Sequence, residues 1–78
     1  MPMPEMKTVQ SSRVFQIGYD DKAQALYVRF TPSKRWPAGR VAVYQGVPPA
    51  TAADIVNAPS IGQAMDVSVK GIFQFSYL

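Results

Sequence analysis

The stretch that decides the fold of this chain is Gly39-Arg40-Val41-Ala42-Val43-Tyr44-Gln45-Gly46-Val47-Pro48. Its two central valines alternate with Arg40, Ala42 and Tyr44, which is typical of a β-strand because successive side chains of a strand point to opposite faces. The glycine and the proline that follow end the strand. The residues before this stretch have the pattern of strands, whereas those after it begin with the pattern of a helix. We therefore predict the middle strand of a small sheet, which runs into the turn before the first helix.

Two further strands are predicted on the N-terminal side, at residues 12–19 and 25–30. Their buried stripes are Phe15, Ile17 and Tyr19 in the first strand, and Leu26, Val28 and Phe30 in the second. The polar link at residues 20–24 favours a turn and is too short for a parallel crossover connection. The two strands should therefore form an antiparallel hairpin.

Two helices and a last strand are predicted after the central strand. The first helix should begin at Thr51 and end near Asn57, because the residue before a proline avoids helical backbone and a proline follows closely. Ser60 opens a capping-box pattern for a second helix at residues 60–70. A strand at residues 72–77 completes the chain.

The stretch at residues 67–70 has an alternative interpretation, because a stripe with the period of a strand crosses it. This stripe consists of Val67, Val69, Phe73, Phe75 and Tyr77. In the alternative, the second helix ends near Asp66 and one long strand follows. We prefer the helix, since Gly71 suits the position just beyond a helix C-terminus.

Together these elements predict an α+β fold: a single small antiparallel sheet in the order β-β-β-α-α-β, with the helices packed on one face. The 78 residues should make one domain at residues 9–78, after a flexible N-terminal arm at residues 1–8. The first residues lack the basic and apolar segments of a secretory leader, and no run approaches the roughly 18 apolar residues of a membrane span. We therefore expect a cytoplasmic protein with no membrane partner.

The composition argues against an enzyme. The chain has no histidine and no cysteine, which removes the commonest general base, the commonest low-pKa nucleophile and the usual ligands of zinc. Disulfide bonds are excluded for the same reason. Asp20 and Asp21 are adjacent and point apart, so they suit a turn better than a catalytic pair. We expect no catalytic residue, no metal and no cofactor.

A set of basic and aromatic residues indicates a binding surface, in a chain whose net charge is +3. The predicted exposed sheet face carries Arg13, Tyr27, Arg29, Arg40 and Tyr44. The loop at residues 31–38 adds Lys34, Arg35 and Trp36 at one end of this face. Arg13 shares the parity of a buried stripe, so it faces outward only if a bulge lies near Ser12. Aromatic rings with cations suit single-stranded nucleic acid, and Arg and Trp are also frequent hot spots of protein interfaces.

Several short motifs occur in a characteristic order along the chain. They are Ser11-Ser12, Gly18-Tyr19-Asp20, Leu26 to Phe30, Gly39 to Tyr44, Val47-Pro48, Ala58, Ser60-x-Gly62 and the aromatic C-terminal end. In order and spacing they resemble the KTSC domain family, over residues 10–78. That family is named for a domain at the C-terminus of some lysyl-tRNA synthetases, and it also occurs as small free-standing proteins of bacteria and phages. The resemblance implies the RNA-binding role suggested for the family.

Two motifs depart from the family pattern. The family shows Tyr-x-Tyr in the central strand, where this chain has Ala42 before Tyr44. A Tyr-Phe-Asn run is replaced by Ala64-Met65-Asp66. The chain therefore lacks two tyrosines that a family-wide working surface would use.

Three roles are compatible with these observations. The first is a non-enzymatic interaction module, a small phage or mobile-element protein that binds and modulates a host protein. The alternative is a domain that binds RNA or single-stranded nucleic acid with the basic and aromatic sheet face. The third is a homo-oligomer, in which the apolar run at residues 72–78 pairs with a second copy.

Overall fold

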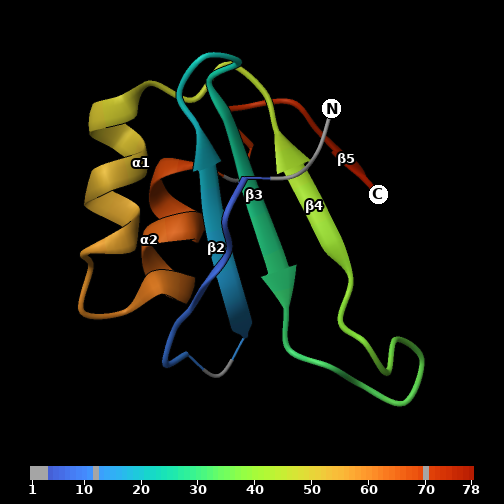
Figure 1. Cartoon of the computed structure of the whole chain (residues 1–78). Coiled ribbons are helices and arrows are strands. Elements are labelled where there is room, and N and C mark those ends of the chain that lie inside the picture. The colour runs from blue at the N-terminus through green and yellow to red at the C-terminus, as the bar shows by residue number, and fades with distance from the viewer. Residues whose placement is uncertain (1–3, 12, 70) are drawn as a thin grey trace.

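The computed structural model describes residues 4–11, 13–69 and 71–78, and it shows one five-stranded sheet with two helices (Figure 1). The elements are β1 (Lys7–Thr8), β2 (Val14–Asp20), β3 (Ala25–Phe30), β4 (Val41–Tyr44), α1 (Pro49–Val56), α2 (Ile61–Ser68) and β5 (Phe75–Tyr77). The strands follow one another in the sheet from β1 to β5, and each pairs antiparallel with its neighbour. The predicted α+β class and antiparallel sheet are confirmed, with the short strand β1 added in front.

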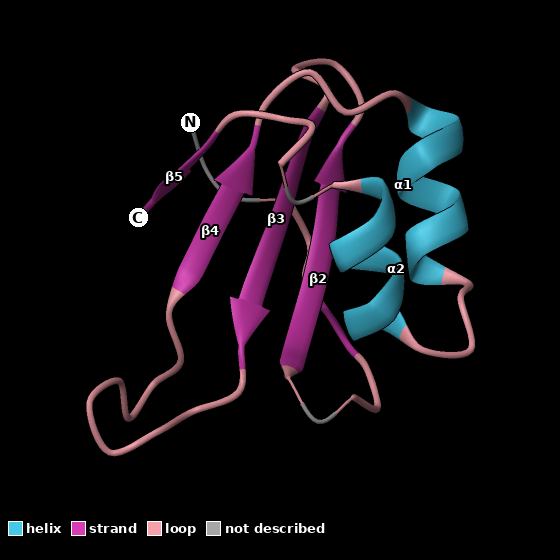
Figure 2. Ribbon diagram, turned by 180° about the vertical axis from the view of Figure 1, so that it is seen from behind, coloured by secondary structure: helices cyan, strands magenta, loops and turns pink. Residues whose placement is uncertain are grey.

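Both helices pack on the same side of the sheet, as predicted. Figure 1 and Figure 2 show them against the β2 half of the sheet, while β4 and β5 lie away from them. The core between these layers is apolar and consists of Val14, Ile17, Leu26, Val28, Ala42, Tyr44, Val47, Ala52, Ile55, Ile61, Met65 and Val69. No helix in the described part of the chain has the length and apolar character needed to cross a membrane.

A bulge in β2 sets which side chains face the helices. The pairing of β2 with β3 shifts between Val14 and Gln16, so Phe15 is the extra residue and is partly exposed. Beyond the bulge, Ile17 lies opposite Val28 and points into the core. The prediction that Phe15 continues the buried stripe of Ile17 was wrong, because an extra residue reverses the parity of a strand. A bulge does occur in β2, but it lies at Phe15, beyond the predicted position near Ser12, and Ser12 itself lies outside the described residues.

The residues at the start of each helix explain where the helix begins. The first helix begins at Pro49, ahead of the predicted Thr51, because proline at the first position already has a helical φ angle. The second helix is capped as predicted, with the Ser60 hydroxyl accepting a hydrogen bond from the Gln63 amide at 3.5 Å. It continues to Ser68, so the alternative in which the helix ends near Asp66 was wrong.

The N-terminal segment lies on the sheet face opposite the helices. A side chain at Gly18 would meet the Met6 sulfur at 2.7 Å and the Glu5 carbonyl oxygen at 2.8 Å, so only glycine leaves room for this segment. Lys7 and Thr8 then pair with Ile17 and Gln16 as β1. The predicted arm at residues 1–8 therefore includes a short edge strand, and residues 1–3 lie outside the described residues.

Candidate functional site at the β4–β5 edge

The connection between β3 and β4 is a loop in which hydrogen bonds hold the backbone around Trp36. Ser33 and Trp36 exchange backbone hydrogen bonds at 3.0 and 3.1 Å, and the Gly39 amide donates to the Trp36 carbonyl at 2.9 Å. Gly39 has a φ angle of +81°, and a side chain there would meet the Phe30 carbonyl oxygen at 2.5 Å. The turn therefore requires glycine, and it holds Trp36 beside the sheet.

Arg40 lies between two aromatic rings. Its guanidinium carbon is 4.4 Å from the centre of the Trp36 ring and 3.6 Å from the centre of the Tyr77 ring. The first ring comes from the loop and the second from β5, so one cation joins segments that are distant in the sequence. Contacts of this kind stabilise an exposed site by about 0.5–1 kcal/mol each.

An aromatic row continues from this arginine along the β4–β5 pair. The Tyr77 and Phe75 rings are in edge contact at 5.4 Å, and Phe75 contacts Tyr44 at 5.2 Å. Tyr44 is buried, whereas the other two rings are about half exposed. Burial raises the pKa of the Tyr44 hydroxyl above its usual value, and the nearby Tyr77 and Asp66 raise it further. The row therefore begins in the core at Tyr44 and ends at the surface at Tyr77.

We call Trp36, Arg40, Phe75 and Tyr77 the edge cluster. Its three aromatic rings are 41%, 51% and 45% exposed, respectively, at Trp36, Phe75 and Tyr77. Ile72 and Leu78 are exposed nearby in sequence, and an open hollow lined by residues 71–75 adjoins Phe75. Large apolar side chains are seldom left exposed together on a protein that acts alone. The edge cluster therefore has the features of a contact surface.

The charge around the edge cluster is positive. Every charged residue from Lys22 to Ala53 is basic, and this segment supplies the loop, β3 and β4. Lys34 and Arg35 extend the positive charge along the exposed loop. A ligand at this edge therefore meets cations and aromatic rings without a competing carboxylate from these segments.

The single basic and aromatic sheet face that we predicted does not exist, because the register separates its members. Tyr27 lies opposite Val43 and Arg29 lies opposite Val41, so these two residues share the face that points away from the helices. Arg29 is partly buried and donates to the Ala38 carbonyl at 2.9 Å, which supports the loop. Tyr44 points to the helix side and is buried in the core.

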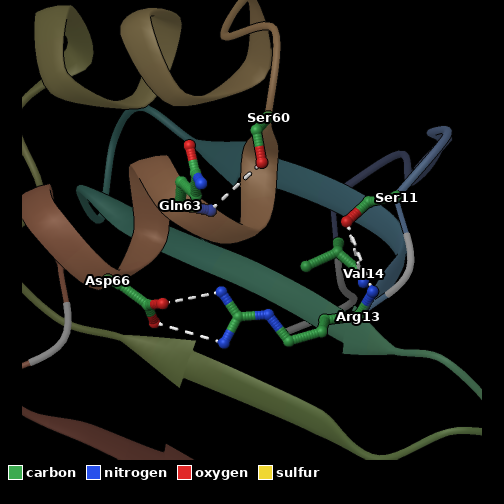
Figure 3. Close-up of polar contacts among 6 residues, drawn as sticks. All are labelled: Ser11, Arg13, Val14, Ser60, Gln63 and Asp66. Carbon is green, nitrogen blue, oxygen red and sulfur yellow. Dashed lines mark hydrogen bonds and ion pairs between the residues drawn. The ribbon is translucent and has the colours of Figure 1, made fainter.

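Arg13 lies in a different region, at the start of α2. Figure 3 shows its guanidinium facing Asp66, with a shortest nitrogen to oxygen distance of 2.7 Å. The guanidinium passes over Gly62, where a side chain would come within 2.9 Å of it. The Ser11 hydroxyl accepts from the Arg13 amide at 3.3 Å and holds the turn before β2. Arg13 therefore ties this turn to α2 and does not join the edge cluster.

No group of three His, Cys, Asp or Glu side chains in the described residues has the arrangement a metal ion needs. The nearby carboxylate is that of Asp66, which forms an ion pair with Arg13 at 2.7 Å. Cations and aromatic rings are chemically suited to contact aromatic, apolar and anionic groups.

Comparison with known proteins identifies the family. Residues 10–73 match the model of the KTSC domain. The chain belongs to the KTSC domain family. A crystal structure of a KTSC domain protein from Yersinia pestis has the same fold, with a TM-score of 0.83 and 30% sequence identity over 95% of this chain and 96% of that one. The resemblance that the motifs indicated is thus confirmed.

A second relative is a much longer protein. A lysine–tRNA ligase from Nostoc punctiforme is 36% identical over 69 residues, which cover 88% of this chain and 11% of the ligase. The KTSC domain therefore corresponds to a small part of that enzyme.

Sequence reasoning found half of the edge cluster. Trp36 and Arg40 were predicted as binding residues, whereas Phe75 and Tyr77 were treated as part of an apolar strand. Their signal was their alternation, which places both on one face of a strand. The partner strand of that face was not evident from the sequence, because Tyr77 pairs with Ala42 across 35 positions of chain.

Proposed function

We propose that this KTSC domain is a non-enzymatic module that binds a partner protein through the edge cluster. The observation that carries this proposal is the Arg40 guanidinium held between Trp36 and Tyr77 beside an exposed Phe75. Tryptophan, tyrosine and arginine dominate the hot spots of protein interfaces, and the two aromatic residues bring large contact areas with few degrees of freedom. Here the stacking already restricts Arg40, so less entropy is lost when a partner binds.

The exposed aliphatic residues favour a protein over a nucleic acid as the partner. Ile72 lines the hollow beside Phe75 and is 62% exposed, and Leu78, which alternates with Tyr77 to the other face, is 70% exposed. Neither side chain can stack on a base or pair with a phosphate. Protein interfaces bury such side chains at their centre. A host protein is the partner we propose for a phage or mobile-element copy of this domain, as its small size and lack of catalytic groups suit modulation by binding.

The test is a capture experiment with a matched control. Wild-type protein, the double variant Trp36→Ala/Phe75→Ala and the control Phe15→Ala are each cross-linked in lysate of the source cells, and captured proteins are identified by mass spectrometry. Phe15 is also a partly exposed phenylalanine, but it lies at the bulge of β2. We expect a protein that wild type and the control capture and that the double variant loses. Identical capture by all three preparations would contradict the proposal.

RNA is the second candidate, and the lysine–tRNA ligase relative is the observation in its favour. All charged residues from Lys22 to Ala53 are basic, and these cations could contact the phosphates of an RNA. Affinity that depends on phosphate contacts falls linearly with the logarithm of the salt concentration. Fluorescence anisotropy of short RNA oligomers tests this, with Arg40→Ala as the variant and Lys7→Ala, a cation of the opposite edge, as the control. No binding at low salt removes this candidate.

A further inference from the structure

We propose that β5 is a docking edge for an extended acidic segment of the partner, which adds to the sheet as an antiparallel strand beside β5. This inference rests on the proposed function and names the chemistry and the binding mode of the partner. The edge cluster supplies the side-chain contacts, and the free main chain of β5 supplies the hydrogen bonds.

Two residues of β5 point their backbone groups away from β4, on a side where no described strand pairs with them. The Gln45 amide donates to the Gln74 carbonyl at 2.8 Å, and the Leu78 amide donates to the Val41 carbonyl at 2.9 Å. Residues of an antiparallel strand alternate between facing one neighbour and facing the other. Residues 74, 76 and 78 therefore face β4, and the amides and carbonyls of Phe75 and Tyr77 face the open side of the last strand.

This edge has only three residues, but it lacks the charges and prolines that protect many edge strands against strand addition. Charged side chains, proline and bulges normally protect edge strands from pairing with another chain. Residues 71–78 contain no charged residue and no proline, and both outward-facing residues are aromatic residues that favour strands. The exposure of Phe75 and Tyr77 leaves side-chain contacts available to the added strand.

The charge of the edge selects an acidic segment. In antiparallel addition, residues directly opposite Phe75 and Tyr77 place their side chains on the same face as the edge cluster. A carboxylate at one of these positions meets Arg40, whose guanidinium lies on the Tyr77 ring. The last strand of a second copy brings no such side chain, because residues 67–78 contain no Asp or Glu. Charge complementarity therefore favours a partner segment with acidic residues at alternate positions.

The main experiment uses synthetic peptides as the probe. A labelled peptide of alternating Glu and Val is titrated with the protein and followed by fluorescence anisotropy, with an alternating Lys and Val peptide as the charge control. Two further versions carry N-methyl groups on all Glu amides or on all Val amides. Because alternate amides of a strand face the same neighbour, we expect methylation of the Glu amides to weaken binding about tenfold or more. Methylation of the Val amides should leave the affinity nearly unchanged.

Protein variants test the same hydrogen bonds from the other side. Tyr77→Ala removes the ring, and Tyr77→Pro removes the ring together with the outward amide hydrogen. Proline is tolerated in an edge strand where its missing hydrogen faces solvent, and circular dichroism checks that both variants remain folded. We expect Tyr77→Pro to bind the Glu and Val peptide at least about fivefold more weakly than Tyr77→Ala, since it lacks one further hydrogen bond. If Tyr77→Pro does not fold, the N-methyl peptides decide.

The outcomes separate this inference from the proposed function. Equal binding of the two N-methylated peptides, or of the Lys and Val peptide, overturns strand addition. A partner captured only when Trp36 and Phe75 are intact, together with no binding of the Glu and Val peptide, overturns the inference and leaves the proposed function standing. Sedimentation that shows a dimer lost in Tyr77→Pro also overturns the inference, because a second copy then occupies β5.

Discussion

The two edges of the sheet differ in composition, and this difference is the basis of our proposal that a partner contacts only one of them. At one edge, β1 has two residues and carries Lys7, and the segment before it packs against Gly18. At the other edge, β5 is uncharged and presents Phe75 and Tyr77 beside Arg40. Both edge strands are short, but a charged edge resists pairing with another chain, whereas an uncharged edge lacks this protection. We therefore propose that the sheet has a protected edge at β1 and a receptive edge at β5.

The largest expected effect removes the receptive edge. We expect Phe75→Ala and Tyr77→Ala each to weaken partner binding by about 2 kcal/mol, roughly thirtyfold, as for central hot-spot residues. The dissociation constant of the Glu and Val peptide is the measurement. Phe15→Ala serves as the matched control and should bind like wild type. A loss of similar size in the control contradicts the difference between the two edges.

A second prediction disturbs the protected edge. Gly18→Val places a side chain where the Met6 sulfur and the Glu5 carbonyl oxygen lie, within 3 Å of the new Cβ atom. Overpacking of this kind lowers the free energy of unfolding by about 1–3 kcal/mol. Urea denaturation gives the loss, and faster hydrogen exchange of residues 7 and 8 locates it. Peptide binding at β5 should stay at the wild-type value, and a parallel loss of binding shows that the edges are coupled.

A third prediction concerns the stacked arginine. Arg40→Gln should lower the free energy of unfolding by about 1 kcal/mol, because it removes two cation–π contacts at a partly exposed site. Arg35→Gln, in the exposed part of the same loop, is the control and should change the stability very little. Thermal denaturation measures both. Fluorescence of Trp36, the only tryptophan of the chain, should change in Arg40→Gln and stay constant in the control.

The smallest effect is expected away from both edges. Asp66→Asn breaks an ion pair with Arg13 whose two side chains are nearly half exposed, so water screens it strongly. Exposed pairs contribute about 0.2–1 kcal/mol, and high salt reduces this further. Denaturation of both proteins at low and high salt should show a small difference that vanishes in high salt. If Asp66→Asn lowers the free energy of unfolding by well over about 1 kcal/mol, the contribution of this contact exceeds that of an exposed ion pair.

Much of the fold was predictable because its signals are local. The alternation at residues 25–30, the proline that ends α1 and the Ser60 cap depend on neighbouring residues, and each was found where predicted. The bulge at Phe15 was harder to place, since one extra residue is defined by the strand opposite it. The start of α1 was missed because Pro49 acts through its own ring and not through a capping side chain.

The site was predictable only in part. Alternation told us which residues of a single strand share a face, but it carries no information on which face of one strand matches which face of the next. Tyr27 and Tyr44 were therefore assigned to one surface, although the register places Tyr27 beside Val43 and Tyr44 in the core. The same limit concealed the pairing that brings Tyr77 to Arg40.

The sequence by itself determined that this is a small α+β domain with an antiparallel sheet, because periodicity, caps and turn residues act within a few positions of one another. It also determined the family, through motifs that span most of the chain. Only the tertiary structure decided that Trp36, Arg40, Phe75 and Tyr77 form one cluster at an open edge. The physical reason is that this cluster depends on the register between β4 and β5, which is set by packing across the whole sheet.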